Sequence, residues 1–88
     1  MEIEATALIG LRVFTPNGIS LGDISNVVID MEEANVNGLF VPDTNPVLVE
    51  GSKAVNVPYR WVQGVGDVII LKHFPKRVSV KGEEKEES

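Results

Sequence analysis

The sequence predicts an all-β protein that folds as a small antiparallel β-barrel of about five to six strands. Its aliphatic residues are mostly valine and isoleucine, which favour strands. Turn signals recur at short, even intervals, and no amphipathic helix longer than one turn is evident before the C-terminal residues. Apolar runs also flank an Asn-Gly pair, as in a hairpin. With 88 residues, the chain has room for one hydrophobic core only.

The stretch 10–30 is the predicted organising hairpin. Its apolar runs, 11–14 and 19–29, flank Asn17-Gly18, which accepts positive φ and lets the chain reverse. Gly22 interrupts the second run, and a glycine inside a strand usually marks a bulge or a bend. A small barrel needs such a bend in its long strands to close. An isolated hairpin is marginal in water, so later strands must cover it.

The other elements follow from apolar runs and turn residues. Residues 1–9 are predicted as an N-terminal segment that either pairs as an edge strand or frays. We expect Asp23, Asp30 and Asp67 to accept hydrogen bonds from turn amides. The barrel domain is assigned to 10–75 and a charged, disordered tail to 76–88. The predicted later elements are a strand at Leu39–Val41, a hairpin of Val47–Val49 and Ala54–Val57, a short 3₁₀ turn near 59–63, a tight turn at Gly64–Asp67 and a last strand at Val68–Leu71.

Composition narrows the function classes. The chain has no cysteine, which excludes disulfides and favours a cytoplasmic protein. It shows neither a signal peptide nor an apolar run of the ~20 residues that cross a bilayer. The net charge is −5, and a basic patch comprising Lys72, Lys76, Arg77 and Lys81 precedes the acidic residues 83–87. Because an acidic body repels a phosphate backbone, nucleic acid is not expected as the principal ligand.

Residues suited to catalysis are few. His73 is the only histidine and lies in a basic run that repels cations, so no metal or other cofactor is predicted. Ser20, Ser25 and Ser52 lack a motif that places a base beside them. We therefore assign no catalytic residue and expect a protein that is not an enzyme.

Some apolar strands do not alternate with polar residues, which predicts apolar side chains on the outer surface. Val28, Phe40 and Ile69 are the candidates for a homodimer seam or partner site, because exposed apolar surface usually marks an interface. The alternative is that the N-terminal segment and the tail cover this face. Arg60 and Trp61 are residue types that dominate interfaces, although Trp61 could instead fill the end of the barrel.

The order and spacing of these motifs resemble the PRC-barrel family over roughly residues 8–72. The matching segments are Gly10-Leu11-Arg12-Val13 before Asn17-Gly18, Leu21-Gly22-Asp23-Ile24, Val27-Val28-Ile29-Asp30, Gly38-Leu39-Phe40-Val41, Val57-Pro58-Tyr59 and the run 62–71. The resemblance implies a small β-barrel used for protein–protein contact, with no catalytic motif to carry over. It is greatest to the stand-alone archaeal proteins of the family.

Some of those archaeal proteins are implicated in cell division, as adaptors between the tubulin-like division ring and a membrane anchor. The resemblance therefore implies a homodimeric adaptor, recruited to the membrane or division site by a protein partner rather than by inserting itself. The alternative is a ribosome- or RNA-associated maturation factor, which the basic patch would suit. A small-ligand domain would need a polar pocket with converging ionisable groups.

Overall fold

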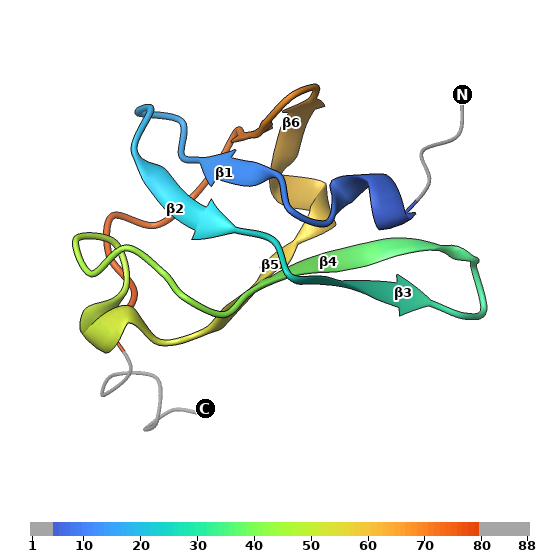
Figure 1. Cartoon of the computed structure of the whole chain (residues 1–88), viewed down its shortest axis with the longest axis horizontal. Helices are drawn as coiled ribbons and strands as arrows, with labels where there is room; N and C mark the ends of the chain where they lie inside the picture. The colour runs from blue at the N-terminus through green and yellow to red at the C-terminus, as the bar shows by residue number, and fades with distance from the viewer. Residues whose placement is uncertain (1–4, 80–88) are drawn as a thin grey trace.

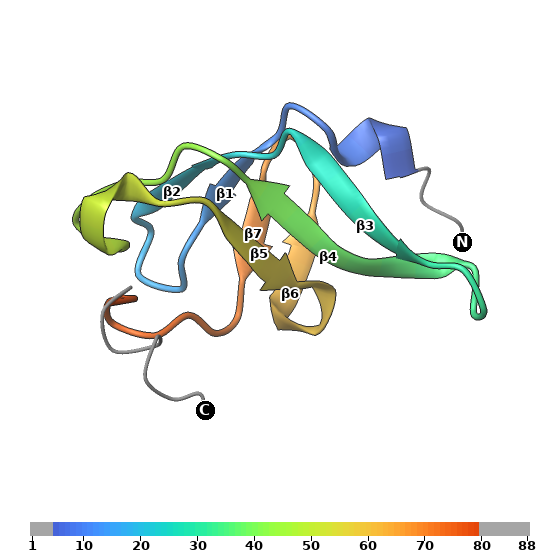
Figure 2. The ribbon, with the colours of Figure 1, turned by 90° about the horizontal axis from the view of Figure 1, so that it is seen from below.

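The computed structural model describes residues 5–79 and consists of two β-sheets packed on one core (Figure 1, Figure 2). One sheet has the strand order β2-β1-β7-β6 and the other the order β3-β4-β5. The elements of this described part are η1 (Ala5–Leu8), β1 (Arg12–Phe14), β2 (Ser20–Asp23), β3 (Asn26–Asp30), β4 (Asn35–Val41), η2 (Glu50–Ser52), β5 (Val55–Pro58), η3 (Tyr59–Trp61), β6 (Val62–Val65) and β7 (Ile69–Leu71), the η elements being 3₁₀ helices.

These elements confirm the all-β class and correct its details. Residues 5–79 hold seven strands instead of about five to six, and hydrogen bonding does not join the two sheets into a closed barrel. Nor is the pairing antiparallel throughout, because β1 and β7 are parallel, with Val13 beside Ile69. In the part of the chain that is described, no helix is long and apolar enough to cross a membrane.

The predicted hairpin is confirmed at its turn. Thr15 and Ile19 close the loop through a backbone hydrogen bond of 2.9 Å from the Thr15 amide to the Ile19 carbonyl. The Thr15 hydroxyl also accepts from the Ile19 amide at 3.1 Å. Gly18 has φ +81°, a value that glycine adopts without strain. The turn chemistry of Asn17-Gly18 therefore sets the β1–β2 register locally.

The long second strand of that hairpin is divided between the two sheets. The carbonyl of Ile24 accepts from Gly10, beside β1, at 2.7 Å, whereas the Ser25 amide donates to Phe40 of β4 at 3.0 Å. The chain thus changes partner between Ile24 and Ser25, as strands do at the corners of packed sheets. The irregularity predicted at Gly22 is confirmed separately, because the β1–β2 pairing shifts register there, with Val13 opposite Gly22 and Phe14 opposite Ser20.

The predicted hairpin of 47–49 and 54–57 is wrong. β5 pairs with β4, and Val49 instead makes a single parallel bridge to Val78. Asn45 explains the difference, because its carbonyl accepts from the Leu48 and Val49 amides, each at 2.9 Å. Its side-chain oxygen also accepts from the Val47 amide at 2.9 Å. These bonds hold the segment in a turn despite its β-branched residues.

The 3₁₀ turn near 59–63 is confirmed as η3, but the tight turn predicted at 64–67 starts later. Gly64 and Val65 belong to β6, which pairs with β7, and the reversal follows at Gly66, whose amide donates to the Val68 carbonyl at 2.9 Å. The prediction missed β6 because Gly64, in the strand, and Gly66, just after it, suggested a turn throughout.

The core lies between the sheets and includes the N-terminal helix η1. Leu8 is fully buried, so the described residues of the segment 1–9 neither pair as an edge strand nor fray. Of the predicted disordered tail, 76–88, residues 76–79 are described, and Val78 among them bridges Val49; residues 80–88 lie outside the described part. The buried apolar side chains are Leu8, Val13, Leu21, Ile24, Leu39, Val41, Leu48, Val49, Val57, Ile69 and Leu71.

Candidate protein-interaction surface

The three-stranded sheet buries one face and exposes the other. Leu39 of β4 lies opposite Val57 of β5 and Val27 of β3, and all three contact the core. Because neighbouring side chains on a strand point to opposite faces, the alternate positions point away from the core. These alternate positions are Asn26, Val28, Gly38, Phe40, Asn56 and Pro58; we call them the outer face.

The middle of the outer face is apolar. Val28 is 38% exposed, and Phe40 and Pro58 are half-buried. Val28, Gly38 and Pro58 form one row across the three strands. The Asn56 side chain lies over Gly38, since its Oδ1 is 2.6 Å from where a Cβ at Gly38 would stand. Val28 and Phe40 thus lie on a single face, as predicted, with Pro58 beside them.

Ile69 does not belong to that surface. It is fully buried, and the prediction that it faces outward is wrong. Ile70 is the exposed residue of β7, at 38%, and lies beside Phe14 on the other sheet. An apolar run of four residues shows no alternation, so its sequence does not reveal which residues point inward.

Trp61 is half-buried and packs against the core from η3. Its ring meets His73 edge-on, with ring centroids 4.7 Å apart, and Phe74 in the same way at 6.1 Å. Such T-shaped arrangements are the favoured geometry for aromatic pairs. Arg60 is exposed. A direct role of Arg60 or Trp61 in partner binding stays a prediction.

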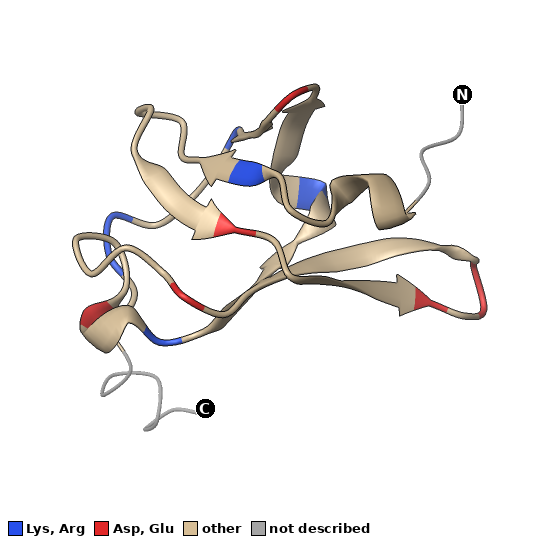
Figure 3. Cartoon of the chain, in the orientation of Figure 1, with Lys and Arg blue, Asp and Glu red and all other residues tan. Residues whose placement is uncertain are grey.

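The β3–β4 hairpin projects beyond the rest of the described chain (Figure 1). The turn at its tip is acidic (Figure 3), and Asp30 accepts from the Glu32 and Glu33 amides at 3.0 and 3.2 Å. This confirms Asp30 as a turn acceptor. Ile29 and Met31 are 39% and 85% exposed there, and Ile29 lies on the face of β3 opposite Val28. Sequence reasoning passed over Met31 because it falls in a turn.

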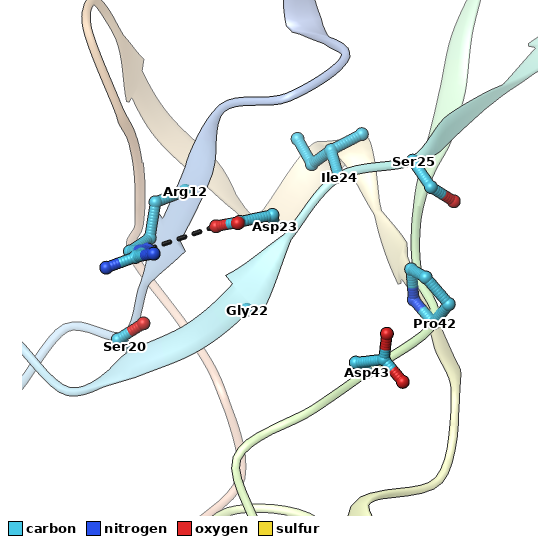
Figure 4. A pocket seen from close by; sticks show the side chains of 8 residues that line it. All are labelled: Arg12, Ser20, Gly22, Asp23, Ile24, Ser25, Pro42 and Asp43. Carbon is cyan, nitrogen blue, oxygen red and sulfur yellow. Dashed lines mark hydrogen bonds and ion pairs between the residues drawn. The ribbon is translucent and has the colours of Figure 1, made fainter.

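An open hollow of about 490 Å³ lies beside Gly22 (Figure 4). On one side Arg12 donates to the Asp23 carboxylate at 3.0 Å, and both side chains are more than half exposed. This hydrogen bond and the charge of Asp23 raise the pKa of the Arg12 guanidinium. Ser20 and Ser25 also line the hollow, which has no histidine or cysteine in its lining. The described residues hold no cluster of three potential metal ligands.

The protein is a compact all-β domain in which two small sheets pack on one core. Its most distinctive feature is the apolar outer face of the three-stranded sheet. The PRC-barrel domain family matches residues 1–78, and the chain belongs to this family. No protein of curated function is similar enough to the chain to count as a relative.

Proposed function

We propose that this protein is a non-enzymatic protein–protein interaction module that self-associates as a homodimer through the outer face. The observation that carries the proposal is the apolar centre of that face, where Val28, Phe40 and Pro58 gather around Gly38. Val28 keeps 38% of its surface exposed, while Phe40 and Pro58 are half-buried and the Asn56 side chain lies over Gly38. Burying apolar area of this kind is the main favourable term in protein association.

A two-fold axis accounts for the homodimer. A second copy turned by 180° lays its own outer face on this one, so that Val28, Phe40 and Pro58 of each copy are covered. Such a contact is self-complementary, because both copies contribute the same residues.

In the cell, we propose that the dimer is an adaptor. The resemblance to stand-alone archaeal members of the family supports a place in archaeal cell division, between the tubulin-like division ring and a membrane anchor. The protein then reaches the membrane through its partner. Affinity purification of the full chain from its native organism, followed by identification of the bound proteins, tests this part. Division proteins absent from the bound fraction would contradict it.

Sedimentation velocity over a range of concentrations tests the homodimer. We expect the full chain to sediment at twice the 9.6 kDa monomer mass at micromolar concentration. The variant Val28→Glu places a carboxylate in the seam, and we expect it to weaken the dimer by at least about 100-fold, because an unpaired buried charge is strongly unfavourable.

The matched control is Val47→Glu, which introduces the same charge at a valine that is 63% exposed and lies outside the outer face. Circular dichroism checks that both variants fold. A wild-type chain that stays monomeric at all concentrations refutes self-association. A dimer that tolerates Val28→Glu as well as Val47→Glu refutes the outer face as its seam.

A further inference from the structure

A second hollow, of about 270 Å³, shares no residue with the outer face. It is lined by the turn that joins β1 to β2 and by the segment 72–76 that follows β7. Pro16 and Ile19 come from the turn, and Lys72, His73 and Lys76 come from the segment. Leu48 and the remaining residues of the two segments, Thr15, Asn17, Phe74 and Pro75, complete the wall. We call this site the basic hollow.

The positive charge of the basic hollow is not neutralised by the described residues. Lys72, Lys76 and the adjacent Arg77 are all exposed. Within residues 5–79 the only ion pair joins Arg12 to Asp23, so it does not involve these cations. No carboxylate lines the basic hollow. Cations gathered in this way attract an anionic group, and the attraction is stronger beside a low-dielectric wall.

Apart from His73 and the polar residues Thr15 and Asn17, the remainder of the wall is apolar and firmly held. Phe74 is half-buried and packs against the core, and its ring lies edge-on to Trp61 at 6.1 Å. Pro16 and Pro75 add rigid apolar surface. Leu48 is only 4% exposed, and its carbonyl accepts from the Val78 amide at 2.8 Å. The walls are therefore formed before any ligand arrives, which reduces the ordering cost of binding.

We propose that the basic hollow binds an acidic linear peptide of a partner protein. Carboxylates of the peptide pair with Lys72 and Lys76, while an apolar side chain between them rests on Pro16, Ile19 and Phe74. Charge complementarity selects this occupant. An RNA is disfavoured because a chain of net charge −5 repels a long phosphate backbone, whereas a peptide places a few charges locally. Trp61 and Phe74 are half-buried and pack against the core, so these two rings present no free stacking platform for bases.

Intrinsic fluorescence reports on this site directly. Trp61 is the only tryptophan, and its ring lies 4.7 Å from that of His73, which lines the basic hollow. The probe is a synthetic peptide in which glutamate alternates with leucine, titrated into the full chain at low salt. We expect saturable change in Trp61 emission, weakened by added sodium chloride through screening. A peptide in which lysine replaces glutamate should produce no change.

Charge reversal localises the binding. We expect the double variant Lys72→Glu with Lys76→Glu to weaken peptide binding by at least about tenfold, since each attractive pair becomes repulsive. Lys53→Glu is the matched control, because Lys53 is exposed and lies outside the hollow. Unchanged affinity in the double variant, or an equal loss in Lys53→Glu, overturns the proposal.

Two further results separate this proposal from its rivals and from self-association. A structured RNA hairpin that binds the wild-type chain more tightly than the acidic peptide overturns it. The variant Val28→Glu should bind the peptide as the wild type does, because the outer face and the basic hollow share no residue. Peptide binding thus stands or falls independently of the dimer.

Discussion

Gly22→Ala probes a close approach between β2 and the chain that leaves β4. Gly22 has φ +148°, a conformation that side chains rarely adopt. A Cβ there would lie 2.5 Å from the carbonyl oxygen of Asp43 and 2.8 Å from Cγ1 of Val41. Asp43 belongs to the loop that leaves β4, so this is a close approach between a strand of one sheet and the chain of the other.

The loop has little freedom to yield. Two residues further on, the Asn45 amide donates to the Leu21 carbonyl at 2.9 Å, and the Asn45 side chain donates to the Ser20 carbonyl at the same distance. Alanine at 22 therefore adds backbone strain of about 1–2 kcal/mol and an overlap of about 1–3 kcal/mol. The sum, about 2–5 kcal/mol, is a large part of the stability of a domain this size.

We expect Gly22→Ala to lower the melting temperature by at least about 10 °C, or to leave the chain unfolded. Urea titration followed by Trp61 fluorescence and far-ultraviolet circular dichroism measures the loss. Gly18→Ala separates backbone strain from steric overlap. Gly18 has φ +81°, so alanine there is strained, but nothing lies within 4 Å of its Cβ position. Gly64→Ala has neither constraint. It should change stability by less than about 1 kcal/mol.

The ordering of these three variants is the test. If Gly22→Ala destabilises no more than Gly18→Ala, the Asp43 carbonyl does not lie against β2 in solution. The close approach then fails as an explanation for the glycine.

Two other variants test single elements by the same denaturation assays. Leu8→Ala should destabilise the protein by about 3 kcal/mol because Leu8 is fully buried. The control Ile9→Ala should lose far less stability, because Ile9 is 44% exposed. Equal small losses in both variants would mean that η1 does not pack on the core. Arg12→Ala should leave the urea midpoint nearly unchanged, because its pair with Asp23 is more than half exposed. Because folding raises the pKa of Arg12, any stabilisation from this ion pair is fully present at neutral pH. That stabilisation is lost only as the pH rises through the folded-state pKa of Arg12. A large midpoint shift at neutral pH would contradict this.

Local chemistry explains the parts of the fold that the sequence predicts correctly. The Asn17-Gly18 reversal and the Asp30 turn each depend on a side chain or a glycine within a few residues. The 3₁₀ helix after Pro58 is equally local. Such elements need no knowledge of distant partners, so pattern and turn chemistry suffice.

Elements that depend on distant partners could not be read in this way. The parallel pairing of β1 with β7 joins residues more than fifty positions apart, and no local signal specifies it. Val47–Val49 has strand-forming residues, yet Asn45 captures its amides in a turn. Gly64 and Gly66 indicate a turn, although pairing with β7 draws Gly64 into a strand. In each case a tertiary contact overrides the propensity of the segment.

The residues of the candidate site also divide into those that local sequence predicts and those that depend on distant strand pairing. Val28 and Phe40 were identified because two-faced apolar runs imply outward side chains, but the inward or outward direction within Val68–Leu71 depends on its register with β1 and β6. Pro58 joined the surface only through its register with Gly38. The basic charges of 72–77 were visible in the sequence, whereas the apolar wall beside them comes from a turn over fifty residues earlier.

The two proposed surfaces belong to different parts of the molecule. Because an adaptor must contact two partners at once, this separation supports the adaptor proposal. The outer face lies on β3-β4-β5, while the basic hollow is built from the β1–β2 turn, Leu48 and the segment after β7. Occupying one does not block the other, so a dimer formed through the outer face keeps two basic hollows free. Two linked sites bind a partner that carries repeated acidic peptides more tightly than one site does, without any new contact. The proposed self-association would thus raise the affinity of the proposed charge-driven site for a partner with repeated acidic segments.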